Sequence, residues 1–223
     1  MSGMTLQTFA QTLAVWAIPV LFAITLHEAS HGYVARRYGD RTAEMLGRVT
    51  LNPLKHIDPI GTVLVPAVML FIGGFIFGWA KPVPVSARNL RNPRRDMVVV
   101  AAAGPVSNIA MAIGWGLLMS GVLVSGAADG NTGRWLLEMG RAGVLINAVL
   151  AVFNLLPIPP LDGGRVASGL LPVRLSDRLD RIEPYGIVIV LVLLFVGVLW
   201  PVLEPVIEAV MLLVYTVTGV PAR

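Results

Sequence analysis

The chain has 223 residues, of which 56% are hydrophobic and only 13% are charged. Because soluble domains usually carry about 25% charged residues, this composition excludes an ordinary soluble domain and predicts a membrane protein with several spanning segments. The absence of cysteine excludes disulfide and thiolate chemistry. The formal net charge of +4 comes from Lys and Arg in loops, so it indicates membrane topology and lipid contact, and we expect no nucleic-acid partner.

The first half of the chain alternates apolar runs with polar loops. Residues 6–38 are predicted to form a helix that crosses the bilayer, since about 20 residues suffice. The polar loop that follows has short β-like character at 44–52. Residues 62–79 are apolar again and contain two adjacent glycines. Residues 80–95 are basic and rich in proline, which predicts an extended segment.

The second half contains further apolar runs at 97–124 and 135–156, a basic amphipathic linker at 165–183, and a helical hairpin at 184–218. We therefore expect an all-α polytopic membrane protein with about five to six membrane segments. It would have a three-helix catalytic core and a small membrane-associated β element. All of these parts would belong to one domain, 1–223, whose core is 6–165.

The sequence HEASH, residues 27–31, stands within the first apolar run. In a helix, His27 and His31 lie one turn apart on the same face, so both imidazoles can bind one metal ion. Glu28 beside them can reach a water molecule that zinc activates by lowering its pKa to about 7. A chance match is the alternative, but ionisable groups at membrane depth are costly and persist where they have a partner or a function. The pattern predicts a zinc site.

Catalytic zinc usually has three protein ligands, so a third is needed. The metzincin pattern would place a histidine at position 37, which is Arg37. The remaining candidates are Glu44, His56, Asp58 and Asp162. His56 lies in a polar loop, where a hydrogen-bonded histidine is the commoner case. Asp162 follows prolines that interrupt an apolar run, and irregular backbone at membrane depth lines protein or a water-filled cavity. Its alternative role is to cap the helix that follows.

Three motifs together resemble the signatures of the site-2 protease family of intramembrane zinc metalloproteases. They are HEASHGYVARRYGD, AGPVSN and NLLPIPPLDGGR, and the match spans residues 26–165. The similarity is to the short bacterial branch, without PDZ or CBS domains. The resemblance implies one zinc ion per chain, bound by His27, His31 and Asp162, with Glu28 as the general base.

The resemblance also implies that Asn154, eight residues before Asp162, binds the substrate and its oxyanion. An interhelical hydrogen bond is the alternative, because membrane proteins often use buried asparagine in this way. Asn108 in AGPVSN has the same two interpretations. It is a candidate for substrate binding, or it acts with Gly104 and Pro105 to let two helices approach closely, which we favour.

The stretch GWAKPVPV resembles the extended segment beside the active site in the same family. A protease must unwind a helical substrate before cleavage, and an exposed edge strand can bind the unwound peptide by β-augmentation. An ordinary surface hairpin is the alternative. The candidate substrate-binding residues of this stretch are Lys81, Pro82, Val83, Pro84 and Val85.

Basic residues gather in the loops at 36–58, 80–96 and 165–183. The positive-inside rule places these loops on the cytoplasmic side and the N-terminus outside. A single crossing by residues 62–79 would put the two most basic loops on opposite sides, so we expect a re-entrant or hairpin path there. All three motifs then face the cytoplasmic side of a multi-pass protein in a prokaryotic cell membrane.

The function that we expect is hydrolysis of a peptide bond within or near a transmembrane segment of another membrane protein. The partners would be this transmembrane protein or peptide and the lipid bilayer. A catalytically inactive zinc-binding membrane regulator or chaperone is the alternative, but metal binding alone does not require Glu28. A zinc transporter is a second alternative. Its polar positions would follow a path, whereas the titratable groups here gather at one depth.

Overall fold

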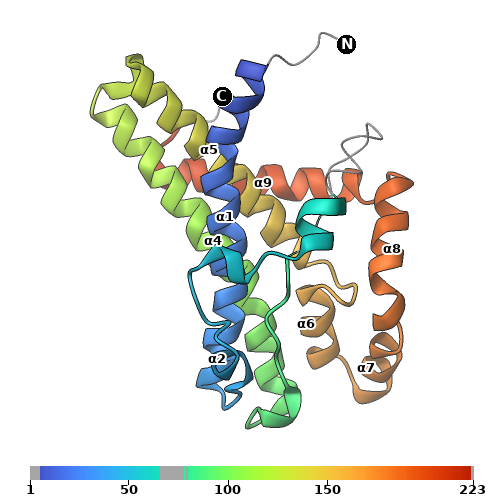
Figure 1. Cartoon of the computed structure of the whole chain (residues 1–223). Helices are drawn as coiled ribbons and strands as arrows, with labels where there is room; N and C mark the ends of the chain where they lie inside the picture. Colours follow the sequence, from blue (N-terminus) through green and yellow to red (C-terminus); the bar gives the residue numbers. More distant parts are fainter. Residues whose placement is uncertain (1–5, 66–77, 79, 222–223) are drawn as a thin grey trace.

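The computed structural model describes residues 6–65, 78 and 80–221, and these residues are mainly helical (Figure 1). The long helices are α1 (Leu6–Arg37), α4 (Pro93–Val124), α5 (Asn131–Asn154) and α9 (Trp200–Thr218). By length and apolar composition, all 4 can cross a membrane. Helix α8 (Glu183–Phe195) is apolar but has 13 residues, fewer than a crossing needs. The prediction of an all-α polytopic chain is confirmed. The larger number of membrane segments that we expected is not found among the described residues.

Helices α1, α4 and α5 pack against one another and form the predicted three-helix core (Figure 1). Small residues at the interfaces allow the backbones to approach closely, as is common between membrane helices. Gly143 of α5 lies against the ring of Trp115 in α4, and Gly116 of α4 lies against Thr218 of α9. Helix α9 thereby packs on both α4 and α5. The close contacts hold the core helices in a defined arrangement, on which a site built from several helices depends.

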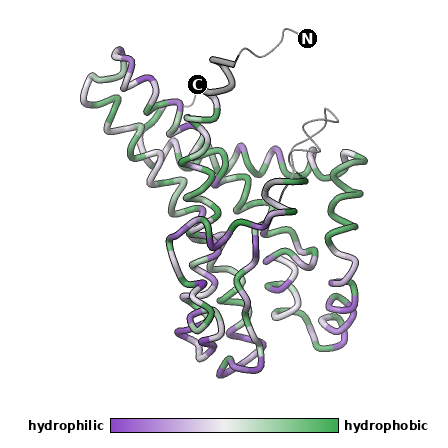
Figure 2. Tube along the Cα trace, in the orientation of Figure 1, coloured by the Kyte–Doolittle hydropathy of each residue, from purple (hydrophilic) through white to green (hydrophobic). Residues whose placement is uncertain are grey.

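The shorter helices of the second half follow the core. Helix α6 (Asp162–Leu170) packs on α4 and leads into α7 (Val173–Asp180). Helices α8 and α9 are separated at Gly197, which has a φ of 79°, and Figure 1 shows α9 running across the direction of α8. Figure 2 shows apolar residues along the long helices and hydrophilic residues gathered around α2 (Thr42–Met45) and α7. One end of the molecule is therefore distinctly polar.

The loops between α1 and α4 contain short helical turns and an extended segment. The turns are η1 (Pro53–Lys55), the π-helical η2 (Pro59–Leu64) and η3 (Ala87–Asn89). Residues 80–86 are extended, but no strand occurs among the described residues. One backbone hydrogen bond, from Lys81 N–H to the carbonyl of His56 at 2.9 Å, joins this segment to the preceding loop.

The predicted β element is thus not found in the described part of the chain, and the reason is physical. Pro82 and Pro84 have no N–H group and cannot extend a ladder of hydrogen bonds. The N–H groups of Val83 and Ser86 donate to carboxylates instead of to a strand. The expected re-entrant path of residues 62–79 lies mostly outside the described residues.

Candidate active site

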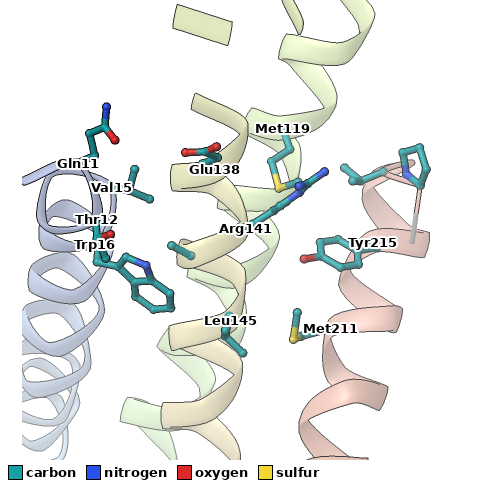
Figure 3. Close-up of a pocket in the computed structure, with 13 residues that line it drawn as sticks. Gln11, Thr12, Val15, Trp16, Met119, Glu138, Arg141, Leu145, Met211 and Tyr215 are labelled. Atoms are coloured by element: carbon teal, nitrogen blue, oxygen red, sulfur yellow. The ribbon is translucent and has the colours of Figure 1, made fainter. Parts of the chain in front are cut away.

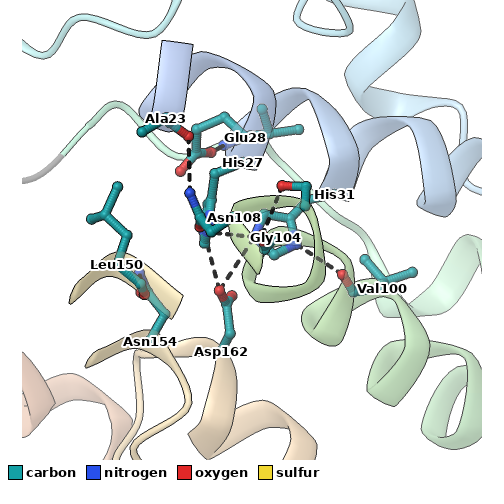
Figure 4. Close-up of polar contacts among 12 residues, drawn as sticks. Ala23, His27, Glu28, His31, Val100, Gly104, Asn108, Leu150, Asn154 and Asp162 are labelled. Atoms are coloured by element: carbon teal, nitrogen blue, oxygen red, sulfur yellow. Dashed lines mark hydrogen bonds and ion pairs between the residues drawn. The ribbon is translucent and has the colours of Figure 1, made fainter. Parts of the chain in front are cut away.

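The two histidines of HEASH lie on one face of α1, as their spacing predicts. Both side chains are buried, with 7% of His27 and 8% of His31 exposed. Their Nε2 atoms are 3.1 Å apart, and the two rings meet edge to face. Helix α1 therefore places two imidazole nitrogens at one point inside the core (Figure 4).

Asp162 reaches this point from the first turn of α6. The segment between α5 and α6 contains a cis peptide bond between Pro159 and Pro160 and folds back on the start of the helix. Gly163 and Gly164 permit this path, because a Cβ atom there would lie 2.2 Å from the carbonyl oxygen of Leu155 and 2.4 Å from the nitrogen of Pro159. The DGG sequence thus combines a carboxylate with two residues that let the backbone pass close beside it.

The Oδ2 atom of Asp162 lies 3.2 Å from His27 Nε2 and 3.3 Å from His31 Nε2. Both distances join a carboxylate oxygen to an imidazole nitrogen, so these three atoms can bind one ion, and the carboxylate would bind it in its ionised form.

Hydrogen bonds of the other ring nitrogens show where the imidazole protons lie. His31 Nδ1 is 2.8 Å from the carbonyl oxygen of Val100, which can only accept, so Nδ1 carries the proton. His27 Nδ1 donates to Asn108 Oδ1 at 2.6 Å. Both Nε2 atoms therefore present lone pairs toward each other and toward Asp162 Oδ2. That oxygen is buried and has no hydrogen-bond partner among the described residues. Lone pairs that converge in this way repel one another unless a cation lies between them.

The geometry of these three atoms fits zinc. Their separations of 3.1, 3.2 and 3.3 Å form a nearly equilateral triangle. Zinc bound tetrahedrally at about 2.0–2.2 Å places neighbouring ligand atoms about 3.3 Å apart. The triangle therefore matches one face of a tetrahedron and leaves the fourth position for water or substrate. Among the described residues, His27, His31 and Asp162 form the one cluster of this kind.

Gly104 of AGPVSN explains how α4 comes so close to the ligands. A Cβ atom on Gly104 would lie 2.4 Å from His31 Nε2 and 2.6 Å from His27 Nε2, which is shorter than any ordinary contact. The absence of a side chain therefore leaves room for the two imidazoles. The close-packing role that we favoured for this motif agrees with the structure.

Glu28 lies one residue beyond His27 on α1 and is partly exposed. Its Oε2 atom accepts a hydrogen bond of 2.7 Å from the backbone N–H of Val83. The contact joins the candidate general base to the extended segment. Glu28 Oε1 makes no hydrogen bond within the part of the chain that the structure describes. One oxygen of the carboxylate is thus anchored, while the other is available.

The extended segment is held against the core at both of its ends. Arg48 is mostly buried and donates to the carbonyl of Lys81 at 2.7 Å. At the other end, the buried carboxylate of Asp40 accepts hydrogen bonds from Ser86 N–H at 2.6 Å and from the Asn89 side chain at 3.1 Å. Burial acts to raise the pKa of Asp40, but hydrogen bonds from Thr42, Ser86 and Asn89 outweigh it, so the pKa is lowered.

The predicted substrate-binding residues of this segment differ in exposure. Lys81 and Pro82 are exposed, Pro84 and Val85 are partly buried, and Val83 is 6% exposed. The N–H of Val83 is bonded to Glu28, so it is not free to pair with a peptide in this conformation. The N–H of Val85 has no partner among the described residues. Binding of a substrate along this segment stays a prediction.

The two asparagines from the motifs have different surroundings. Asn154 ends α5, is partly exposed, and its side chain donates to the Leu150 carbonyl at 2.9 Å (Figure 4). Its role in substrate binding stays a prediction. Asn108 is completely buried, and its amide contacts His27, Asn147 and the carbonyl of Ala23. Asn108 thus contacts one of the candidate metal ligands, and its role in substrate binding stays a prediction.

The other candidates for the third ligand have different partners. Glu44 pairs with Arg36 and Arg41 on the surface. Asp58 caps η2 by accepting from the N–H groups of Ile60 and Gly61. His56 is 1% exposed, and its Nε2 lies 3.0 Å from the Thr50 carbonyl. None of the three belongs to the cluster around His27.

A separate cavity of about 540 Å³ lies between α1, α5 and α9 (Figure 3). Gln11, Trp16 and Tyr215 line it together with the charged side chains of Glu138 and Arg141. The cavity contains none of the metal ligands. We therefore assign it no part in the chemistry of the site.

The fold and the site define a polytopic membrane protein with two histidines and one aspartate arranged to bind a metal ion. A family model described as "Peptidase family M50" matches residues 120–197. The chain is 42% identical over 194 residues to "Putative zinc metalloprotease YwhC" of Bacillus subtilis (strain 168), an alignment that covers 84% of each protein. It is 30% identical over 190 residues to "Putative zinc metalloprotease Rip2" of Mycolicibacterium smegmatis, covering 83% of this chain and 67% of that protein.

No solved structure matches the chain. The sequence similarity is nevertheless extensive enough to assign the protein to a family. It belongs to peptidase family M50, the site-2 protease family. The predicted family is confirmed, and zinc is confirmed as the cofactor, since both relatives carry the name "Putative zinc metalloprotease" and His27, His31 and Asp162 lie close enough together to bind a metal ion.

Proposed function

We propose that this protein is an intramembrane zinc metalloprotease that hydrolyses a peptide bond within or near a transmembrane segment of another membrane protein. The observation that supports this proposal best is the convergence of His27, His31 and Asp162 within 3.3 Å of one another, with Glu28 beside them. A site that only stores zinc has no need of a partly exposed carboxylate next to an open coordination position.

The residues of the chain would divide the reaction between them. His27, His31 and Asp162 hold the zinc ion, which supplies a Lewis acid that polarises the scissile carbonyl and lowers the pKa of water to about 7. Glu28 accepts the proton of the attacking water and passes it to the nitrogen of the leaving amine. Asn154 would hold the substrate carbonyl and the negative charge that develops on its oxygen.

The extended segment 81–85 would bind the unwound substrate. The exposed part begins with Lys81 and Pro82, and Val85 N–H is available for a backbone hydrogen bond. Val83 N–H becomes available only when it leaves Glu28, so binding along the whole segment would require it to shift. This β-augmentation would provide affinity without selecting particular side chains.

The polar end of the molecule would face the cytoplasm of a prokaryotic cell. Basic residues support this orientation: α1 ends with Arg36 and Arg37, and α4 begins with Arg94 and Arg95. The positive-inside rule places such helix ends on the cytoplasmic side. The active site would then open toward the cytoplasm.

The experiment that tests the proposal compares membrane-protein fragments from cells that contain the wild-type protein with those from cells that contain Glu28→Gln. Glutamine has nearly the same shape but cannot accept the proton, so cleavage should stop while zinc content and fold stay unchanged. Fragments that appear equally in both cell types would refute the proposed role of Glu28.

A further inference from the structure

A chain of hydrogen bonds crosses all three core helices and ends on a zinc ligand. The side-chain nitrogen of Asn147 in α5 donates to the Gly143 carbonyl at 2.8 Å. The oxygen of Asn147 accepts from the side-chain nitrogen of Asn108 in α4 at 2.9 Å. The oxygen of Asn108 in turn lies 2.6 Å from His27 Nδ1 in α1. Both asparagines are 0% exposed, so water does not compete for these groups.

The backbone carbonyl at one end of this series of hydrogen bonds determines which group donates at each step. The Gly143 carbonyl can only accept, so Asn147 must turn its NH₂ group toward it and its oxygen toward Asn108. Asn108 therefore points its NH₂ group at Asn147 and at the carbonyl of Ala23, 3.3 Å away. The oxygen of Asn108 is left facing His27, which must then carry its proton on Nδ1. Nε2 consequently keeps its lone pair for the metal.

The two histidines obtain this tautomer in different ways. His31 donates to the backbone carbonyl of Val100, an acceptor that no side-chain substitution removes. His27 depends on Asn108, an amide that could present either its oxygen or its NH₂ group. Two acceptors of the Asn108 NH₂ group select the oxygen for His27: Asn147 Oδ1 at 2.9 Å and, at the longer distance of 3.3 Å, the carbonyl of Ala23. The tautomer of His27 therefore depends on side chains outside the cluster, and the shorter of the two contacts that orient Asn108 is the one with Asn147.

We propose that Asn147 is a positioning residue for the zinc site: acting through Asn108, it keeps the proton of His27 on Nδ1 and so leaves Nε2 free to bind zinc. This inference rests on the proposed zinc enzyme but concerns a residue in none of its motifs. Outer-shell partners of metal-binding histidines typically change metal affinity by about 10–100-fold when they are removed.

The test measures zinc affinity of the purified protein by competition with a chelator. Asn147→Leu removes the acceptor for Asn108 and should weaken zinc binding by about 10–100-fold. Asn147→Asp should stay within about threefold of wild type, because a buried, protonated carboxyl keeps both contacts: its O–H donates to the Gly143 carbonyl and its other oxygen accepts from Asn108. If Asn147 acted only by packing, Asn147→Asp would weaken zinc binding more than Asn147→Leu, since leucine is apolar and aspartate is not.

A spectroscopic signature tests the tautomer directly. The chain has three histidines, so ¹⁵N-histidine labelling gives a simple spectrum in which protonated and unprotonated ring nitrogens are distinct. In metal-depleted wild-type protein, His27 should carry its proton on Nδ1, and in Asn147→Leu this preference should be lost. Thr218→Val is the matched control. It also removes a buried polar group, but within the described part of the chain the Thr218 hydroxyl bonds only to carbonyls of its own helix, so the zinc affinity and the spectrum should not change.

Each outcome bears on the proposal. Zinc affinity of Asn147→Leu equal to that of wild type, or an equal loss in Asn147→Asp and Asn147→Leu, would overturn it. If Asn147→Leu does not fold, Asn147→Ala removes the same acceptor without added bulk and carries the same expectation. Absence of zinc from wild-type protein would refute the proposed enzyme, whereas the ¹⁵N spectrum would still report on the His27 tautomer.

Discussion

The substitution Gly104→Ala would place one methyl group against the zinc ligands. Its Cβ atom would lie 2.4 Å from His31 Nε2 and 2.6 Å from His27 Nε2, whereas ordinary contacts begin near 3.4 Å. His31 Nε2 would have to move by about 1 Å to restore a normal contact, yet zinc sites tolerate changes in bond length of only about 0.2 Å. The three ligand atoms therefore cannot keep their present positions beside a methyl group on residue 104.

The magnitude follows from the cost of overpacking, about 1–3 kcal/mol for an inserted methyl group. If the ligands adapt in the zinc-bound state, this cost falls on zinc binding and lowers the affinity about 5- to 150-fold, since 1.4 kcal/mol is a factor of ten. Chelator competition on purified protein measures this loss. Peptidase activity at limiting zinc should fall with it.

Two substitutions in the same helix separate this effect from a general loss of stability. Gly114→Ala meets no atom within 4 Å and should leave zinc affinity unchanged. Gly116→Ala would lie 2.8 Å from Thr218 Oγ1, so it should lower the unfolding temperature but not the zinc content of folded protein. Wild-type zinc affinity in Gly104→Ala would refute the reasoning and show that α4 does not closely cover the site.

Further predictions concern the third ligand, the extended segment and its side of the membrane. Asp162→Ala should lose zinc, whereas His56→Ala should keep it, as metal analysis of the two proteins will show; the reverse result would overturn the ligand assignment. Asp40→Asn should lower stability near pH 7 by about 1–3 kcal/mol, because donors around a buried acceptor lose their partner. The lowered pKa of Asp40 means that its stabilisation is present above the unfolded pKa of about 3.9 and is lost as pH falls through the folded pKa. The thermal unfolding curves of wild type and Asp40→Asn should therefore approach each other as pH falls below the unfolded pKa of about 3.9, and a constant difference would contradict this. Cysteine introduced at the exposed Lys81 should crosslink to a cysteine near the substrate's cleavage site and react with a thiol reagent confined to the cytoplasm. Labelling only from outside would reverse the proposed topology.

The zinc cluster was predictable because each ligand has a local signal. Two histidines four residues apart share a helix face whatever the rest of the fold does. Asp162 could be predicted because prolines and glycines around it break an apolar run. The long helices were predictable for a similar reason, since a run of about 20 apolar residues has few other ways to satisfy its backbone in a membrane.

The contacts that tertiary packing creates could not be predicted in this way. Asn147 is one asparagine in an apolar helix, and nothing in its neighbourhood identifies Asn108, 39 residues earlier, as its partner. The extended segment was predicted, but its pairing was not. Alternating prolines indicate a strand-like backbone, while the acceptors for Val83 and Ser86 are the carboxylates of Glu28 and Asp40, distant in sequence.

The hydrogen bond between Glu28 and Val83 affects the choice of an inactive variant for trapping a bound substrate. Glutamine at position 28 keeps a carbonyl oxygen that can accept from Val83 N–H, so the segment stays where it is while proton transfer is lost. Alanine would remove the base and release the segment at the same time, which would confound slower chemistry with altered peptide binding. Complexes captured with Glu28→Gln should therefore represent the native binding mode, and differences between the two variants would measure how much the anchored segment contributes to holding the peptide.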